Sequence, residues 1–145
     1  MWKLVVAARQ KYLGPSAQAV SDALFSLANC LDFEGKRVEA ESLYLKALAM
    51  ETKLVGPNHP NVGVMLVSLA GCESMQGKYD ESLKHFARSI EILKSAGEST
   101  RAHLRTAFYG YARVLDRLGR PIDSEKVREE MAVALGEHKT TPNRE

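Results

Sequence analysis

Four histidines are the residues best suited to acid–base or metal chemistry in this chain. They are scattered along the sequence, at His59, His85, His103 and His138. A zinc site on a helix would need two histidines about four residues apart on one face, and no such pair occurs. His59 stands in the segment Gly-Pro-Asn-His-Pro, where we expect it to pack or hydrogen-bond at a turn. We expect His85 and His103 on helix surfaces, so the histidines predict neither a metal site nor a catalytic pair.

The two cysteines, Cys30 and Cys72, could act as nucleophiles only if a neighbouring base or cation lowered the pKa of the thiol. Their neighbours are instead the acidic residues Asp32 and Glu73. Two cysteines also do not make a disulfide framework, which indicates a reducing compartment. The sequence contains no glycine-rich phosphate loop and no serine–histidine–aspartate arrangement. We therefore predict that the chain is not an enzyme and needs no cofactor or metal.

Composition is that of an ordinary single-domain protein. The chain has 145 residues, of which 45% are hydrophobic and 26% charged. A net charge of +2 is too small to hold a nucleic-acid backbone. No apolar run approaches the roughly 20 residues that span a bilayer. The stretch from Leu4 to Ala8 is shorter than the about 7–15 apolar residues of a secretory signal, although a mitochondrial presequence stays open. We predict a cytoplasmic protein that neither binds nucleic acid nor inserts into membranes.

A repeat of 42 residues organises the chain. When the sequence is written in steps of that length, equivalent residues share columns without a gap: Gly35, Gly77 and Gly119; Ala28, Ala70 and Ala112; Leu24, Leu66 and Phe108. Each unit reads as two amphipathic helices, and the glycine ends the first of them. Neither helix can bury its apolar stripe alone. Neighbouring helix pairs must therefore stack on one another.

The predicted helices begin after turns that contain Gly-Pro or Gly-Glu. Ser16, then Asn58, then Ser99 or Thr100 can each accept a hydrogen bond from the first free amides of a helix. Pro60 suits a first-turn position. We predict a repeat domain over residues 1–135, divided into a half repeat (1–13) and three repeats (16–55, 58–96 and 99–135). A disordered tail is predicted over 136–145.

The order of large, small and glycine positions resembles the tetratricopeptide signature, with a leucine in place of the opening tryptophan. The positions that carry this resemblance are Leu24, Leu27, Ala28, Leu31, Ala40, Tyr44 and Ala47. The longer period and the phrases Tyr12-Leu13-Gly14-Pro15 and Leu54-Val55-Gly56-Pro57-Asn58-His59-Pro60 are similar to the kinesin-light-chain subgroup of these repeats. The resemblance covers about residues 1–135. It implies an all-α fold, a right-handed α-solenoid of about three and a half stacked antiparallel helix pairs.

Two departures from the signature matter. Glu73 stands where an apolar or aromatic residue is usual, and Arg128 stands where the third repeat should have an aromatic. The last helix combines a narrow apolar stripe with a polar face, which is typical of a terminal capping helix.

The resemblance implies that the first helix of each pair lines an inner groove. The residues expected on the open face of these helices are Asp22, Phe25, Ser26, Asn29, Phe33, Val64, Val67, Ser68, Gly71, Met75, Thr106, Tyr109, Gly110, Arg113 and Arg117. Some of the apolar ones could instead pack inside the superhelix. If they are open, they form an apolar groove suited to an extended or helical peptide. Arg113 and Arg117 at one end, and Asp22 with Asp32 at the other, would orient that peptide.

Two known binding modes of the family can be compared with these residues. Chaperone-binding tetratricopeptide domains clamp a carboxylate with lysine and asparagine, and only Asn29 falls at such a position here. The kinesin-light-chain groove binds acidic-aromatic cargo peptides through basic and asparagine residues, which are present only in part, as Arg113 and Asn29. A chaperone-tail function is therefore not expected.

Residues 1–12 align with the second helix of a repeat whose first helix is missing. An apolar face of Trp2, Val5, Val6 and Tyr12 is then left uncovered. Either the chain is a fragment of a longer array, or a partner or second copy covers this face. The leading prediction is a protein–protein interaction module, a scaffold or adaptor that binds a peptide. The alternative is a structural unit that stacks on other repeats through its N-terminal helix.

Overall fold

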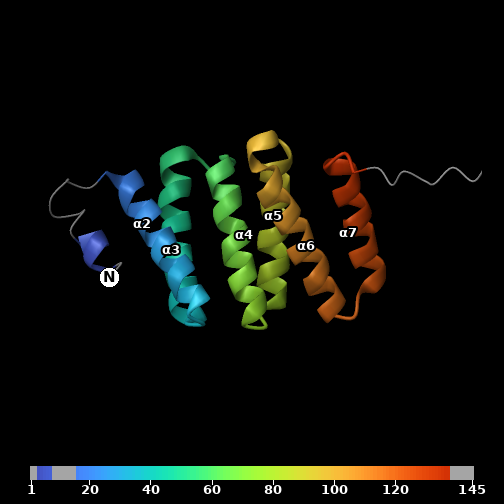
Figure 1. Cartoon of the computed structure of the whole chain (residues 1–145), viewed down its shortest axis with the longest axis horizontal. Helices are drawn as coiled ribbons and strands as arrows, with labels where there is room; N and C mark the ends of the chain where they lie inside the picture. Colours follow the sequence, from blue (N-terminus) through green and yellow to red (C-terminus); the bar gives the residue numbers. More distant parts are fainter. Residues whose placement is uncertain (1–2, 8–15, 138–145) are drawn as a thin grey trace, which may run out of the picture.

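The computed structural model describes residues 3–7 and 16–137, and within them the chain forms helices without strands (Figure 1). Three antiparallel helix pairs follow one another along the chain: α2 (Ala17–Phe33) with α3 (Arg37–Val55), α4 (Pro60–Met75) with α5 (Tyr79–Lys94), and α6 (Arg101–Arg117) with α7 (Pro121–Ala134). A single 3₁₀ turn, η1 (Glu98–Thr100), precedes α6, and residues 3–7 are also helical. The predicted fold class, an α-solenoid of stacked helix pairs, is confirmed.

The predicted repeat ranges each contain one of these pairs. Within each pair the helices are joined by a turn whose glycine has a positive φ, 80° at Gly35, 77° at Gly77 and 70° at Gly119. The amide after each glycine donates to the carbonyl five residues earlier, as from Lys36 to Leu31 at 2.9 Å. This left-handed stop costs least without a Cβ, and it confirms that glycine ends the first helix of each unit.

Of the three predicted helix starts, all within the described residues, the first alone has the predicted side-chain cap. Ser16 caps α2, and its hydroxyl accepts a hydrogen bond from the amide of Ala19 at 3.4 Å. The cap of α4 is His59 instead of Asn58, with Nδ1 accepting from the amide of Asn61 at 3.2 Å. The expectation that His59 hydrogen-bonds at the turn is therefore confirmed.

The polar side chains at the other two helix starts make different contacts. The amide oxygen of Asn58 accepts from the guanidinium of Arg88 on α5. Before α6, the chain first makes η1, and Thr100, one of the two predicted residues, is the N-cap residue of α6. Its hydroxyl donates back to the carbonyl of Gly97 at 3.1 Å and makes no capping hydrogen bond.

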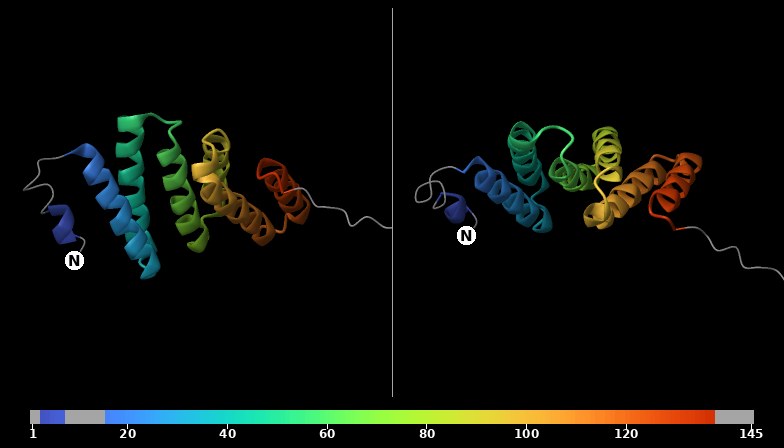
Figure 2. Two further views of the ribbon diagram at one scale, coloured as in Figure 1. Left: turned by 45° about the horizontal axis from the view of Figure 1, so that its top comes forward. Right: turned by 90° about the horizontal axis from the view of Figure 1, so that it is seen from above.

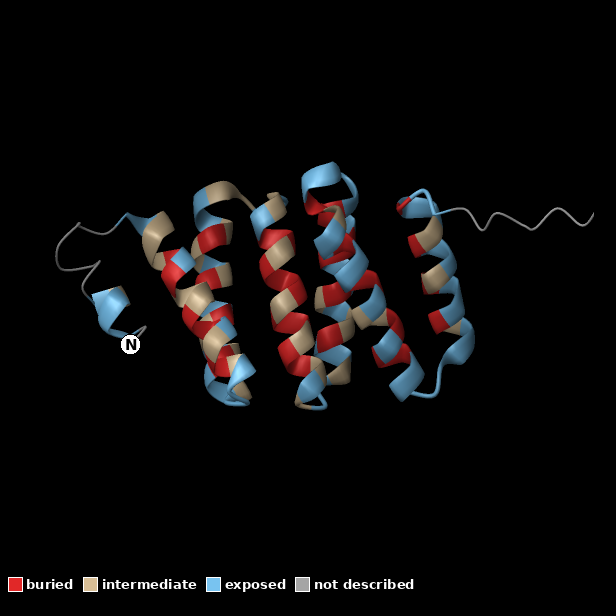
Figure 3. Ribbon diagram, in the orientation of Figure 1, coloured by how far each residue is buried: buried red, intermediate tan, exposed pale blue. Residues whose placement is uncertain are grey.

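Small residues let the two helices of a pair approach closely. Ala28, Ala70 and Ala112 are completely or almost completely buried, and so is Ser82 on α5. The hydroxyl of Ser82 donates to the backbone carbonyl of Ala70 at 2.7 Å. Figure 3 shows the buried residues gathered where helices face one another, with exposed residues on the outer faces.

A buried carboxylate ties the first repeat to the second. Glu51, near the end of α3, is fully buried and accepts three hydrogen bonds. They come from Gln18 at 2.9 Å, Ser21 at 3.1 Å and Asn61 at 2.9 Å. Because these donors lie at the starts of α2 and α4, one side chain fixes the positions of three helix ends.

The pairs stack in chain order along the longest axis of the molecule (Figure 1). Seen from above in Figure 2, α3 and α5 lie on one side, and α2, α4 and α6 lie on the other. Among the described helices, none joins enough length to enough apolar character to cross a bilayer. Most of the predicted tail, residues 138–145, lies outside the described part of the chain.

Candidate functional site

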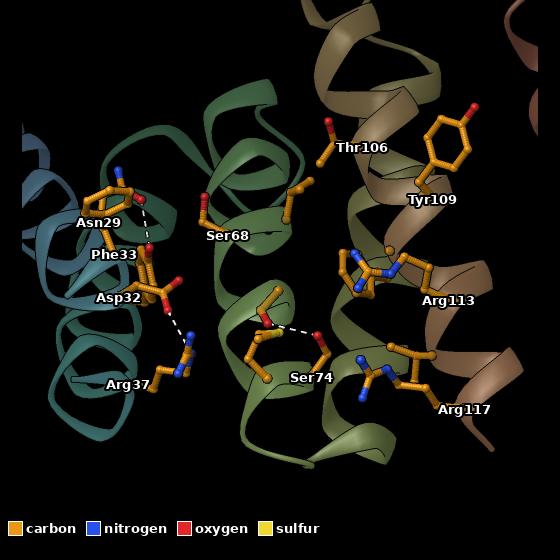
Figure 4. A pocket seen from close by; sticks show the side chains of 17 residues that line it. Asn29, Asp32, Phe33, Arg37, Ser68, Ser74, Thr106, Tyr109, Arg113 and Arg117 are labelled. Carbon is orange, nitrogen blue, oxygen red and sulfur yellow. Dashed lines mark hydrogen bonds and ion pairs between the residues drawn. The ribbon is translucent and has the colours of Figure 1, made fainter. Parts of the chain in front are cut away.

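The first helices of the three repeats line a hollow of about 650 Å³, which we call the groove (Figure 4). Its lining combines residues of α2, α4 and α6 with a few that reach it from α3 and α5. They are Asn29, Asp32, Phe33, Arg37, Tyr44, Val67, Ser68, Gly71, Ser74, Met75, Phe86, Thr106, Tyr109, Gly110, Arg113, Val114 and Arg117.

Most of the residues predicted for the groove line it. They are Asn29, Phe33, Val67, Ser68, Gly71, Met75, Thr106, Tyr109, Gly110, Arg113 and Arg117. Several occupy equivalent repeat positions, such as Asn29 and Arg113, or Phe33, Met75 and Arg117. The 42-residue register therefore brings the same face of each first helix to one surface.

The other four predicted residues lie outside the groove. Phe25 is half-buried, and its ring packs against that of Tyr44 with centroids 5.6 Å apart. Val64 is half-buried against the core of the second and third repeats. Asp22 is exposed, and its backbone carbonyl accepts from the hydroxyl of Ser26 at 2.8 Å. These residues lie earlier in α2 and α4, before the stretch where the helices frame the hollow.

The first-repeat side of the groove is polar but close to neutral. The hydroxyl of Tyr44 donates to Oδ1 of Asn29 at 2.7 Å, and burial raises the pKa of that phenol. Asp32 lies 3.5 Å from Nε of Arg37, which balances its charge. Burial raises the pKa of Asp32, and the nearby Arg37 opposes that rise.

The third-repeat side is apolar at its base. Phe86 reaches between α4 and α6, and a Cβ on Gly110 would lie only 2.2 Å from its ring. Val67 and Val114 are buried beside it. Tyr109 is exposed on the rim (Figure 4).

Two cations stand at this end of the groove without counterions. Arg113 and Arg117 are exposed, and neither takes part in an ion pair with any residue that the structure describes. The neighbouring Arg128, by contrast, is paired with Asp116 at 2.5 Å. The groove therefore joins an apolar base to two arginines that can accept an anionic group.

Five residues that line the groove were not predicted from the sequence, namely Arg37, Tyr44, Ser74, Phe86 and Val114. Tyr44 and Phe86 are buried in the gap between adjacent repeats, each in a core cluster that joins two repeats. That same gap opens onto the groove. The position of these two residues within the repeat could therefore have predicted that they line the groove.

Two of the residues considered for chemistry, Cys72 and His85, make packing or hydrogen-bond contacts within the fold. Cys72 is buried, and burial raises the pKa of its thiol to about 11, so the thiolate is disfavoured at neutral pH. His85 is half-buried rather than on the surface, and its Nδ1 lies 2.7 Å from a carboxylate oxygen of Glu73. His103 is exposed, and His138 lies outside the described residues. In the described ranges, no group of three or more His, Cys, Asp or Glu could hold a metal ion.

The predicted assembly surface is described only in part. Val5 is exposed and Val6 half-buried in the helical segment 3–7, whereas Trp2 and Tyr12 lie outside the described residues. Beside this segment is a smaller hollow of about 350 Å³. It is lined by Lys3, Leu27, Leu31, Val38, Glu39, Ser42 and Leu43.

Comparison with known proteins identifies the repeat. The family model for the tetratricopeptide repeat matches residues 23–95 and again residues 61–130. No curated protein matches the chain. Among solved structures, BtubC (BKLC) from P. vanneervenii is similar with a TM-score of 0.80 and 18% identity, over 99% of this chain and 59% of that one. A Podospora anserina protein described as a kinesin light chain with nearly identical TPR-like repeats has a TM-score of 0.80 and 19% identity, over 97% of this chain and 68% of that one.

Proposed function

The chain belongs to the tetratricopeptide repeat family, and from that premise we propose that it is an interaction module that binds a peptide in its groove. Repeats of this family generally mediate protein–protein interaction or assembly. The proposed ligand is a peptide segment with at least one carboxylate and one large apolar side chain.

The observation that carries this proposal is the pair of unpaired arginines beside an apolar base. A guanidinium binds a carboxylate through two parallel hydrogen bonds, and such charge-assisted bonds are among the stronger ones in proteins. Arg113 and Arg117 lie one helical turn apart on α6, so both can face the same ligand. An acidic side chain at this end would be bound and oriented by them.

The apolar part of the ligand has a place between α4 and α6. Met75 and Tyr109 are exposed there, above the buried ring of Phe86. In the middle of the groove Gly71 has no side chain, and a Cβ built on it would meet nothing within 4 Å. A ligand side chain can therefore enter without displacing a protein group.

The first test is selection of binders from a displayed library of short random peptides, followed by fluorescence polarisation with the selected peptides. We expect acidic and large apolar residues to be enriched. The double variant Arg113→Glu/Arg117→Glu should weaken binding by more than about tenfold, because attraction becomes repulsion. Enrichment of basic peptides, or no binder at all, would overturn the proposal.

Gly71 offers a second test with a matched control. Gly71→Trp should fill the middle of the groove and abolish peptide binding. Gly71→Ala should leave binding intact and raise the free energy of unfolding by about 0.5–1 kcal/mol, because alanine is the better helix residue. If both variants bind the selected peptide equally well, the peptide does not occupy the groove.

A further inference from the structure

Positive charge is concentrated at the third-repeat end of the groove. Among the described residues that line it, the cations are Arg37, Arg113 and Arg117, and the single anion is Asp32. Asp32 lies 3.5 Å from Nε of Arg37, so these two charges balance within the first repeat. The two positive charges that remain both belong to α6.

These two arginines keep their charges because the nearest acid along α6 is engaged elsewhere. Asp116, next to Arg117 in the sequence, pairs with Arg128 of α7 at 2.5 Å. Within residues 3–7 and 16–137, neither Arg113 nor Arg117 forms an ion pair. Figure 4 shows both side chains extending from α6 toward α4, across the groove. Residues one helical turn apart are neighbours on a helix surface, so one ligand group can contact both guanidiniums.

The number of unpaired cations favours a dianion. One carboxylate carries a single charge and would leave the second guanidinium without a counterion. A phosphorylated serine or threonine carries about 1.5 to 2 negative charges at pH 7 and three strong acceptor oxygens. One such side chain can therefore bind both arginines. Two separate carboxylates would have to order two side chains, which costs more conformational entropy.

The rest of the groove favours a peptide over a free phosphate ion or a lipid headgroup. Its volume of about 650 Å³ is far larger than one phosphate group, and it extends from Asn29 on α2 to Arg117 on α6. Between these ends lie the apolar Val67 and Phe86 and the open space at Gly71. A phosphate bound at α6 therefore leaves room for the flanking residues of a chain.

We propose that the groove binds a peptide phosphorylated on serine or threonine, with its phosphate held by Arg113 and Arg117. This inference rests on the proposed function, because it concerns the anionic group of the same ligand. A carboxylate at that position binds the two arginines more weakly. Phosphorylation of the partner therefore increases its affinity for this chain.

The test uses a peptide selected from the random library, synthesised with serine, glutamate or phosphoserine at each acidic position in turn. In fluorescence polarisation, phosphoserine at one of these positions should bind at least about tenfold more tightly than glutamate, and serine should bind most weakly. Arg113→Gln and Arg117→Gln should each remove most of that preference. Lys126→Gln removes the same charge from an exposed position of α7 outside the groove and should leave the preference unchanged.

A glutamate peptide that binds as tightly as every phosphoserine version overturns this inference, and so does a preference that survives Arg113→Gln/Arg117→Gln. The proposed function fails separately, if none of the selected peptides binds in the groove. Vesicles that contain a phosphorylated inositol lipid test the other source of phosphate. If they sediment the wild type but not the double variant, while the phosphopeptide gains nothing over glutamate, a lipid occupies the site and the inference is wrong.

Discussion

Each repeat places two core residues twelve positions apart, one on its first helix and one on its second, and the middle repeat differs from its neighbours at this pair. The outer repeats use apolar residues, Leu31 with Leu43 and Leu115 with Val127, which belong to the apolar core clusters. The middle repeat has Glu73 and His85 at the same positions, with Nδ1 of the histidine 2.7 Å from the carboxylate. Glu73 is only 2% exposed, so an acidic side chain lies in the core where the first and third repeats have leucine.

Polar contacts also hold the middle repeat to the first. Near this pair, Glu41 of α3 accepts hydrogen bonds from Lys78 at 2.6 Å and from Gln76 at 2.7 Å. The first and second repeats are therefore joined by directional polar contacts as well as by apolar packing. A buried hydrogen bond contributes little net stability, but removing one partner is costly because the other is left buried and unsatisfied. We expect the middle repeat to tolerate fewer substitutions at these positions than the outer ones.

The largest effect is expected from His85→Leu. This change leaves the carboxylate of Glu73 buried without its partner. We expect the free energy of unfolding to fall by about 1–3 kcal/mol, the cost of leaving a buried polar group without its hydrogen-bond partner. Urea unfolding followed by circular dichroism measures the loss. His85→Gln keeps a hydrogen-bond donor and should lose less; equal losses would show that the contact does not matter.

A smaller effect of opposite sign is expected from the double variant Glu73→Leu/His85→Val. It gives the middle repeat the residues of the third repeat, Leu115 and Val127. Replacing both partners of a buried hydrogen-bonded pair by well-packed apolar residues can be neutral or stabilising, and we expect a gain of up to about 1–2 kcal/mol in the same assay. A net loss would mean that the second repeat cannot pack the apolar pair that the third repeat packs.

The 42-residue register explains how much of the fold and of the groove could be predicted from the sequence. Aligning the sequence in steps of 42 residues predicted the helices, the turn glycines and most groove residues. These features depend only on the periodicity of the sequence and on the backbone angle φ. The same alignment showed that Glu73 is unusual at its position. It did not identify His85 as the partner of Glu73, because His85 was expected on a helix surface. The twelve-residue offset of Leu31 and Leu43 would have placed His85 opposite Glu73. The cap of α4 by His59 and the groove residue Arg37 were missed because they depend on which of several nearby polar groups a side chain meets.

The smallest effect concerns the polar contacts beside the pair. Burial raises the pKa of Glu41, but the hydrogen bonds from Lys78 and Gln76 outweigh it, and the net pKa lies below the ordinary value. A lowered carboxyl pKa stabilises the fold above the unfolded-state value, and this stability is lost as the pH falls through the folded-state value.

Wild type should therefore be more stable than Glu41→Gln at neutral pH, by under about 1 kcal/mol because Lys78 is partly exposed. The difference should shrink below about pH 4.5, as Glu41 becomes protonated. Thermal unfolding of both proteins from acid to neutral pH measures it. A difference that stays constant with pH would contradict the role of the charge.

The contact between Phe86 and Gly110 restricts how this molecule could have been assembled or could be rebuilt. The ring occupies the space that any side chain at position 110 would need. The equivalent positions in the other repeats are Ser26 and Ser68. A second repeat followed by a copy of itself would therefore bring a serine against that ring. The units look alike in sequence, but the third repeat carries the glycine that this ring needs. Any rearrangement that places the first or second repeat after the second would first require a glycine at the serine position.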